Sequence, residues 1–324
     1  MRAVVCRDYG TPEDLVLTDI PDPQPGPGQV LVRIRAAAVN FPDVLLIAGK
    51  YQIKLPVPFT PGSELAGEVM SVGHGAMFRP GDRVFGTTPT GAFAEQVVLG
   101  SHSLVAVPDD VDLAEAAAFG VTYRTAYHAL RSVAAVTEGD WVVVLGAAGG
   151  VGLAAVDLAV AMKARVIAAA SSPEKEALCR QRGAEATIDY ERENLRERIR
   201  DLTAGHGADA VIDPVGGRYS EPALRAIGRS GVFVTLGYAT GSIPSIPLNL
   251  VLLKGITIRG MEIRTFPMDY PEAATRDNAE LSEMFADGRI RPYVGARFPL
   301  EDTAAALRCV ADRRALGKVV IDVA

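Results

Sequence analysis

The sequence predicts an α/β protein in which a doubly wound, six-stranded parallel sheet is joined to a second, mainly β domain. Three features lead to this prediction. Short apolar runs alternate with helical segments in the middle of the chain, a glycine-rich turn follows the first of these runs, and the first third carries short β-type runs. Alternating strands and helices indicate a parallel sheet covered by helices on both faces. Right-handed crossovers then favour the doubly wound order.

The first third is predicted to be mainly β. The turn-rich stretch PDPQPGPG (21–28) separates two strand candidates, and QVLVRIRAAAV (29–39) begins with the alternation of a half-buried strand. Further strand candidates are 64–73, 82–86 and 92–99. A helical segment over 110–133 then ends this part of the chain.

The parallel sheet is predicted from six apolar runs, at 141–147, 164–170, 186–190, 208–215, 231–238 and 255–260. The helices between them are predicted at 151–162, 173–182, 193–203 and 219–228. A helix at 302–313 and a strand at 317–323 are expected to return to the β domain. The predicted domains are therefore 122–262 for the sheet and 1–121 with 263–324 for the β domain.

Composition excludes several classes of partner. The net charge of −6 argues against a nucleic acid or an anionic membrane as a partner. The three cysteines are far apart and form no CxxC pair, which suits a reducing cytoplasm. Early charges at Arg2, Arg7 and Asp8 argue against a signal peptide. The apolar segment 141–162 carries glycines and Asp157, so we expect a strand, a turn and a helix there, and no membrane span.

The glycine-rich turn LGAAGGVG (145–152) indicates a dinucleotide site. Gly149 allows close approach of a pyrophosphate, Gly152 allows the following helix to pack tightly, and the helix directs its free N–H groups at the phosphates. Ala147 replaces the first glycine of the usual G-x-G-x-x-G spacing, which is tolerable if the turn needs no positive φ there. The expected cofactor contacts in this loop are Ala148, Gly149, Gly150 and Val151.

The residues after the second strand of the sheet favour NADPH over NADH. Ala170 stands where NAD-binding proteins usually carry an acidic residue, so nothing there repels a 2′-phosphate. Ser171, Lys175 and Tyr190 are the expected phosphate contacts. The alternative is that this segment is an ordinary helix start, with Ser172 as its N-cap.

Seven motifs carry a family resemblance: NFPDVLLIAGKY (40–51), PFTPGSELAGEV (58–69), PGDRVFG (80–86), GAFAE (91–95), VTYRTAYHAL (121–130), LGAAGGVG (145–152) and RALGKVV (314–320). In this order they resemble the medium-chain dehydrogenase/reductase superfamily, and within it the zinc-free NADPH:quinone oxidoreductases. The resemblance covers essentially the whole chain. It implies a Rossmann dinucleotide-binding domain and a GroES-like catalytic domain.

The resemblance also implies that no metal is bound. The positions of the zinc ligands in zinc-dependent relatives match Asn40, Ser63 and Val121, and none of these is a plausible zinc ligand. Alcohol oxidation needs a Lewis acid in this architecture. We therefore expect hydride transfer from NADPH to a quinone or an α,β-unsaturated carbonyl.

Asn40 and Tyr51 are the catalytic residues that the resemblance implies. Asn40 is expected beside the nicotinamide and the substrate, and Tyr51 beside the same pocket. Tyr51 either donates a proton or hydrogen bond to the reduced oxygen or serves as a pocket wall. A tyrosine that some relatives carry between these two positions is Leu45 here.

The remaining implied cofactor contacts are Thr125, Leu236, Gly237, Ala239 and Arg314. Thr125 has the alternative of bonding within its own helix, and Arg314 that of a solvated surface charge. The last sheet strand, 255–260, is expected to pair with its copy in a homodimer. Two other functions stay open: an enoyl-thioester reductase of the same superfamily, and a protein without catalytic activity that binds or senses NADPH.

Overall fold

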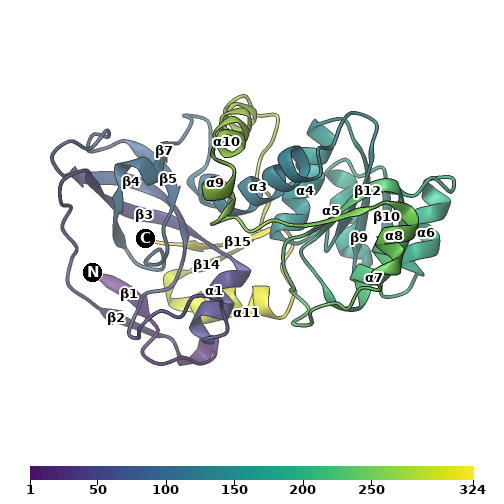
Figure 1. Ribbon diagram of the computed structural model, residues 1–324. Coiled ribbons are helices and arrows are strands. Elements are labelled where there is room, and N and C mark those ends of the chain that lie inside the picture. The colour runs from purple at the N-terminus through teal and green to yellow at the C-terminus, as the bar shows by residue number, and fades with distance from the viewer. The chain divides into compact units, whose positions relative to one another are not determined.

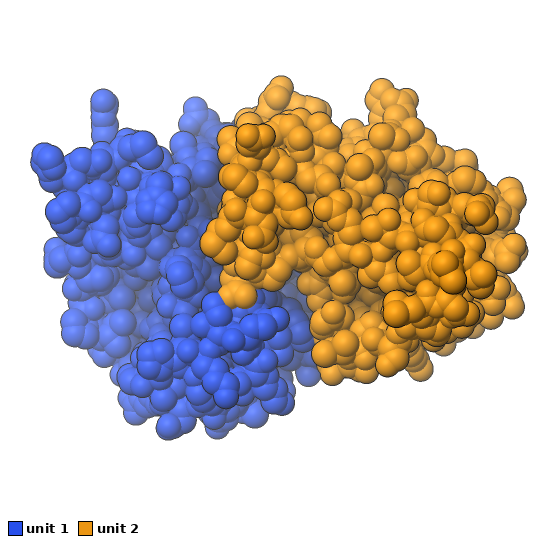
Figure 2. Space-filling model, in the orientation of Figure 1, with its two compact units in different colours: residues 1–121, 292–324 blue, residues 122–291 orange.

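The computed structural model describes residues 1–324, which form two compact units. Unit 1 consists of Met1–Val121 and Pro292–Ala324, and unit 2 of Thr122–Arg291 (Figure 2). Both chain termini therefore belong to unit 1 (Figure 1).

Unit 2 is built on a six-stranded parallel sheet in the order β10-β9-β8-β11-β12-β13. The strands are β8 (Trp141–Leu145), β9 (Arg165–Ala170), β10 (Ala186–Asp189), β11 (Ala208–Asp213), β12 (Ile227–Thr235) and β13 (Thr257–Gly260). The chain starts in the middle with β8 and winds outward in both directions, so the predicted doubly wound α/β class is confirmed. Every residue of β8 is buried, as a continuous apolar run in a parallel sheet requires.

The helices of unit 2 connect and cover these strands. They are α3 (Gly120–Tyr127, which begins at the end of unit 1), the π-helical segment η3 (His128–Val133), α4 (Gly150–Ala161), α5 (Pro173–Gln181), α6 (Leu195–Leu202), the short turn η4 (Gly217–Tyr219), α7 (Ser220–Ala226), α8 (Asn249–Lys254), α9 (Phe266–Asp269) and α10 (Pro271–Ala286). The helix predicted over 110–133 is interrupted. It consists of α2 (Leu113–Ala117), α3 and η3.

The apolar helix α4 carries one buried carboxylate, Asp157. Arg182 holds it with two hydrogen bonds, Nε to Oδ1 at 2.7 Å and Nη2 to Oδ2 at 2.5 Å, and the hydroxyl of Tyr123 donates to Oδ2. Burial raises the pKa of Asp157, and the guanidinium opposes this rise.

No helix in the structure has both the length and the apolar character needed to span a membrane.

Residues 263–291 belong to unit 2, although the sequence analysis assigned them to the β domain. The reason is a set of polar contacts between α10 and η3. Asp277 is fully buried, lies 2.9 Å from Nδ1 of His128 and accepts a hydrogen bond from Ser132. Glu280 accepts hydrogen bonds from Tyr127 and Arg131. These pairs are more than a hundred residues apart in sequence, so no local pattern reveals them.

Unit 1 contains a seven-stranded sheet in the order β14-β15-β3-β4-β5-β7, with β6 paired to β3, and a separate β1-β2 pair. The strands are β1 (Arg2–Val5), β2 (Val16–Asp19), β3 (Gln29–Val39), β4 (Glu64–Val72), β5 (Arg83–Thr87), β6 (Gln96–Gly100), β7 (Leu104–Ala106), β14 (Val294–Pro299) and β15 (Lys318–Asp322). The helices are α1 (Phe41–Ile47), α2, α11 (Thr303–Ala311) and the short turns η1 (Pro12–Asp14), η2 (Ser101–Ser103) and η5 (Leu300–Asp302). The predicted mainly β second domain is confirmed.

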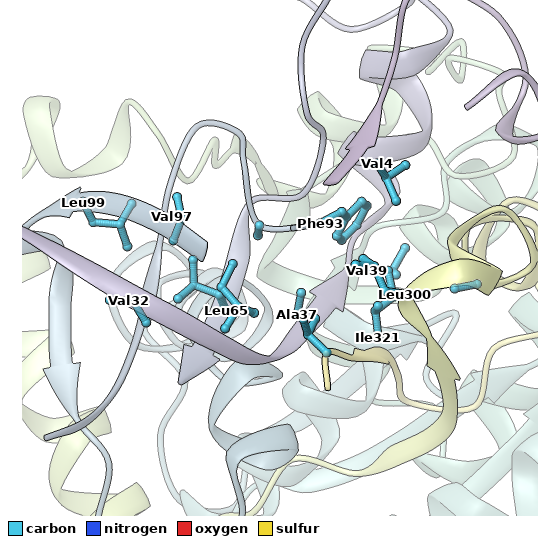
Figure 3. Close-up of a cluster of buried hydrophobic side chains, with 14 of the residues drawn as sticks. Val4, Val32, Ala37, Val39, Leu65, Phe93, Val97, Leu99, Leu300 and Ile321 are labelled. Atoms are coloured by element: carbon cyan, nitrogen blue, oxygen red, sulfur yellow. The ribbon is translucent and has the colours of Figure 1, made fainter. Parts of the chain in front are cut away.

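The core of unit 1 joins the two ends of the chain. Figure 3 shows Val4, Val39 and Phe93, from the first hundred residues, together with Leu300 and Ile321, from the C-terminal end of the chain. The C-terminal strand β15 pairs antiparallel with β3, and Val319 lies opposite Val39. This register places the first residue of β15 next to the residue that follows β3.

Candidate active site

Four polar side chains form a buried cluster in unit 1 where β3 ends and β15 begins. They are Asn40, Asp43, Glu64 and Lys318, and their exposed fractions are 5, 0, 1 and 3 %. Asn40 follows β3, Asp43 lies in the first turn of α1, and Glu64 and Lys318 are the first residues of their strands. Charged groups rarely become this buried unless they are paired, so the pairing within the cluster determines its properties.

Lys318 is the cation of the cluster. Its Nζ lies 2.7 Å from Oδ1 of Asn40, 3.1 Å from Oε2 of Glu64 and 3.3 Å from the carbonyl oxygen of Val39. An ammonium group has three N–H donors, so each donor has an acceptor. The other oxygen of Glu64 accepts the backbone N–H of Val121 at 2.7 Å.

Asn40 is held through both its backbone and its amide. Its backbone N–H donates to Oδ2 of Asp43 at 2.8 Å, and Asn40 is the N-cap of α1, with Asp43 at the third helical position. The sequence N-F-P-D produces this capping box, because Pro42 is tolerated in the first turn of a helix. The side-chain Nδ2 donates to Oε2 of Glu64 at 3.0 Å and lies 3.5 Å from the carbonyl oxygen of Ala38.

Asp43 is the least solvated member of the cluster. Burial raises the pKa of its carboxyl to about 7, although the backbone N–H of Asn40 and the ammonium of Lys318 both lower it. Its Oδ1 is buried without a hydrogen-bond partner. The cluster thus contains one ammonium and two carboxyl groups, of which Asp43 retains its proton up to near-neutral pH.

The other predicted catalytic residue, Tyr51, also belongs to unit 1. It lies beyond α1 and is partly exposed. Leu45, which stands where some relatives carry a tyrosine, lies inside α1. The catalytic role of Tyr51 stays a prediction.

In unit 2, the glycine-rich loop has the geometry of a phosphate-binding turn. The positive φ of the turn falls on Gly146 (58°), and Ala147 has none, which is the condition under which alanine is tolerated there. Gly149 is the N-cap of α4 and provides no side chain to cap it, so the first-turn N–H groups can bind a ligand. A Cβ on Gly152 would lie 2.2 Å from the Gly146 carbonyl oxygen, so only glycine fits.

The residues predicted to contact a 2′-phosphate gather after β9. Nζ of Lys175 lies 3.0 Å from Oγ of Ser171, and the backbone N–H of Tyr190 donates to the carbonyl oxygen of Ala170. Ala170 is buried, and no acidic side chain replaces it at the strand end. Ser172 is also the N-cap of α5, so the segment serves as a helix start as well.

Two backbone N–H groups of the turn after β12 donate hydrogen bonds to carbonyl oxygens at the end of β11 and directly after it. The N–H of Leu236 donates to the carbonyl oxygen of Asp213 at 2.8 Å, and that of Ala239 to the carbonyl oxygen of Pro214 at 3.3 Å. The hydrogen bonds within this turn do not use the amide of Gly237. Leu236, Gly237 and Ala239 stay predicted cofactor contacts, and of their three backbone N–H groups that of Gly237 has no hydrogen bond within the turn.

Thr125 and Arg314 belong to different units. Thr125 is buried in α3. Arg314 is mostly exposed and lies 3.3 Å from the carboxylate of Asp312, as expected of a solvated surface charge. Their roles as cofactor contacts stay predictions.

Lys318 was not among the predicted site residues, although it lies in the RALGKVV motif (314–320). A lone lysine at the start of the apolar run KVVID was the available signal, because a charge beside a buried strand needs a partner. Its partner Glu64 lies 254 residues away in sequence, so the pair could not be recognised locally.

The parallel sheet with its glycine-rich loop and the mainly β unit define a class of protein, the oxidoreductases that bind a nicotinamide dinucleotide. Two family models match the chain. One is described as a zinc-binding dehydrogenase and matches residues 150–277, and the other is the alcohol dehydrogenase GroES-like domain, which matches residues 26–109.

Known proteins similar to the chain are quinone oxidoreductases and their relatives. A quinone oxidoreductase-like protein 2 homolog from Nematostella vectensis is 37% identical over 99% of this chain and 88% of its own length. The quinone oxidoreductase of Pseudomonas aeruginosa is 37% identical over 97% of both chains. The chain therefore belongs to the quinone oxidoreductase family of the medium-chain dehydrogenase/reductase superfamily.

Solved structures share the whole fold. The Escherichia coli quinone oxidoreductase complexed with NADPH has a TM-score of 0.91 at 26% identity and covers 99% of this chain and 100% of its own. An NAD-dependent alcohol dehydrogenase has a TM-score of 0.92 at 33% identity and covers both chains completely. The protein is accordingly an oxidoreductase with a nicotinamide cofactor.

The residues in the cluster do not fit the zinc ion that one family description suggests. Val121 contributes a backbone N–H there, and the amide oxygen of Asn40 already accepts a hydrogen bond from the Lys318 ammonium. A second cation at this place would be repelled by that ammonium. The structure contains no group of three or more His, Cys, Asp or Glu side chains arranged to hold a metal ion.

The raised pKa of Asp43 predicts a pH-dependent stability. In the folded protein this carboxyl retains its proton up to about pH 7, whereas in the unfolded chain it loses the proton near pH 3.9. Between these values the folded state binds more protons, so the contribution of Asp43 to stability falls as the pH rises, by up to about 1.4 kcal/mol per pH unit. The variant Asp43→Asn should therefore gain stability relative to the wild type across this window, as measured by urea unfolding at several pH values.

The matched control is Asp19→Asn, which changes an exposed aspartate. Its stability difference from the wild type at each pH is the reference for the Asp43→Asn difference. A difference for Asp43→Asn that does not change over this pH range would show that Asp43 is ionised throughout.

Proposed function

We propose that the protein is a zinc-independent reductase that transfers hydride from NADPH to a quinone or an α,β-unsaturated carbonyl. The observation that carries this proposal is the ammonium of Lys318, buried between Asn40 and Glu64. It is a cation supplied by the chain itself in the place that matches the metal site of zinc-dependent relatives. A site of this kind does not hold an alkoxide on a metal, so we assign it a different kind of substrate.

A quinone or enone suits such a site because it is already electrophilic. Its own carbonyl delocalises the negative charge that arrives with the hydride. The protein then needs to orient the acceptor and to offer hydrogen-bond donors to the carbonyl oxygen. NADPH, when bound, supplies the hydride.

The donors that we assign to this task are the amide of Asn40 and the hydroxyl of Tyr51. As hydride adds to the acceptor, one oxygen of the acceptor becomes an oxyanion. A hydrogen bond from Tyr51 stabilises this charge, and the proton that completes the reduction reaches the oxygen through the tyrosine hydroxyl, which solvent then reprotonates. The product is the hydroquinone, or the enol that tautomerises to the saturated carbonyl compound.

We assign the cofactor as NADPH on two grounds. The Escherichia coli relative was solved in complex with NADPH. In this chain, Lys175 and Ser171 lie within hydrogen-bond distance of each other after β9, where Ala170 provides no carboxylate to repel a phosphate. The residues of this chain thus favour the phosphorylated cofactor, although one similar structure is that of an NAD-dependent enzyme.

We also propose a homodimer and a cytoplasmic location. Strand β13 is an unpaired edge of the sheet, and Ile258 on it is 38% exposed. Three leucines in α8 and at its N-cap, Leu248, Leu252 and Leu253, are 75, 82 and 65% exposed. An unpaired edge strand and exposed apolar side chains are features that a second copy of the chain can cover. The three cysteines are free and buried, which suits a reducing compartment.

The experiment that tests the function follows NADPH absorbance in the presence of a simple quinone, an enone and a crotonyl thioester. The proposal predicts rapid oxidation of NADPH with the quinone or the enone, and a slower rate in the Tyr51→Phe variant because one hydrogen bond to the reduced oxygen is lost. Activity confined to the thioester would identify an enoyl-thioester reductase. Tight NADPH binding without turnover of any acceptor would indicate a protein that only binds or senses NADPH.

The cofactor preference depends on Lys175. A charge-assisted hydrogen bond contributes about 1.5–3 kcal/mol, so Lys175→Met should weaken NADPH binding by about tenfold or more. The affinity for NADH should change little, because NADH has no 2′-phosphate. Calorimetric titration of both cofactors measures this, with Lys163→Met, an exposed lysine of unit 2, as the control. Tighter binding of NADH than of NADPH by the wild type would contradict the assignment.

The dimer is tested by sedimentation velocity at micromolar concentration. The wild type should sediment as a dimer, and Leu252→Asp should sediment as a monomer because it buries a charge at the proposed interface. A monomeric wild type under these conditions would refute the dimer without affecting the proposed reaction.

A further inference from the structure

The two hydrogen bonds of the Asn40 amide select one orientation of that amide. Its oxygen accepts from the ammonium of Lys318 at 2.7 Å, and its nitrogen donates to the carboxylate of Glu64 at 3.0 Å. If the amide turned over, its NH₂ group would face the ammonium and its oxygen would face the carboxylate. Two attractive contacts would become two repulsive ones, and charge-assisted contacts are the strong ones in proteins.

Lys318 and Glu64, which bind the Asn40 amide, make further hydrogen bonds of their own. Lys318 also donates to the carbonyl oxygen of Val39, and the second oxygen of Glu64 accepts the backbone N–H of Val121. Both side chains are at most 3% exposed, so water competes little with these contacts. The orientation of Asn40 is therefore set before any ligand binds.

One N–H of the Asn40 amide is left without a strong acceptor. Besides its contact with Glu64 at 3.0 Å, Nδ2 lies 3.5 Å from the carbonyl oxygen of Ala38, which is the outer limit of a hydrogen bond. Asn40 is the member of the cluster that the resemblance places beside the nicotinamide and the substrate, and its exposed fraction of 5 % is the largest of the four. The ammonium on the amide oxygen draws electron density away from the nitrogen and makes this N–H a stronger donor.

We propose that Lys318 is a positioning residue of the reduction: through the Asn40 oxygen it fixes and strengthens the amide N–H that donates to the carbonyl oxygen of the acceptor. This inference rests on the proposed function, since it assigns Lys318 to the same reaction. Lys318 acts through Asn40 and does not touch the acceptor. Its positive charge therefore acts on the reacting carbonyl only through the Asn40 amide.

The competing explanation is that Lys318 only neutralises Glu64. Lys318→Met alone does not separate the two, because it leaves a buried carboxylate without its partner and can prevent folding. The double variant Lys318→Met/Glu64→Gln removes both charges together. Asn40 and a glutamine can pair in either orientation, so the double variant retains hydrogen bonding in the cluster and loses its directionality.

The experiment compares the wild type, the double variant and Lys163→Met, which removes an exposed lysine of unit 2. Steady-state rates with NADPH and a simple quinone give kcat and the KM for NADPH. Hydrogen exchange of the Asn40 side-chain amide, assigned by its loss in Asn40→Ala, gives the order of the amide without reference to turnover. Thermal unfolding reports whether each variant is folded.

The proposal predicts a folded double variant in which kcat falls by about tenfold to a hundredfold, the KM for NADPH is unchanged, and the Asn40 amide exchanges faster. Lys163→Met should match the wild type in all three. A folded double variant with wild-type kcat would overturn the proposal and leave charge neutralisation as the role of Lys318. Unchanged exchange of the Asn40 amide in the double variant would also overturn it.

Failure of the proposed function gives a different result. In that case the wild type itself oxidises no NADPH with the quinone, and the exchange measurement alone decides whether Lys318 orders Asn40. Should the double variant not fold, Lys318→Met and Glu64→Gln are examined singly by the same exchange measurement. Equal exchange of the Asn40 amide in a folded single variant and in the wild type would then refute the positioning role.

Discussion

The buried ion pair between Lys318 and Glu64 is the interaction on which the candidate site depends. Removing two charges from water costs several kcal/mol for each ion, so such a pair persists only when further hydrogen bonds satisfy both groups. Here Lys318 has three acceptors, and Glu64 accepts from Lys318, Asn40 and Val121. The pair exists because β15 returns to β3 in a register that places Val319 opposite Val39. The last strand of the chain therefore completes a site that the first forty residues begin.

The glycine-rich loop and the polar cluster belong to different units. Unit 2 provides a glycine-rich loop whose backbone and helix N-terminus suit a pyrophosphate, and unit 1 provides the polar cluster. The Lys318 ammonium already supplies a cation within this cluster. In the function that we propose, the acceptor stabilises negative charge itself, which is why we propose a quinone or an enone.

The sequence was sufficient for those parts of the fold that depend on local pattern. The six apolar runs became the six strands of the sheet, because a buried parallel strand is apolar throughout. The tolerance of Ala147 in the loop followed from the positive φ that Gly146 alone requires there. The N-cap role of Ser172, weighed as an alternative, is present in the structure beside the contact between Lys175 and Ser171.

The parts that could not be predicted depend on contacts between distant residues. The assignment of α10 to unit 2 depends on Asp277 meeting His128, and the strand β14 is recognised only by its pairing with β15. The partner of Lys318 is likewise remote in sequence. Glu64 directly follows Ser63, one of the positions that match the zinc ligands, yet nothing in the sequence showed that a lysine would lie between Glu64 and Asn40.

The most direct test of this account is the zinc content of the purified protein, measured together with its turnover of NADPH and a quinone before and after treatment with a chelator. The account predicts far less than one zinc per chain and a rate of quinone reduction that the chelator does not change. Stoichiometric zinc, with chelator-sensitive oxidation of an alcohol, would contradict it.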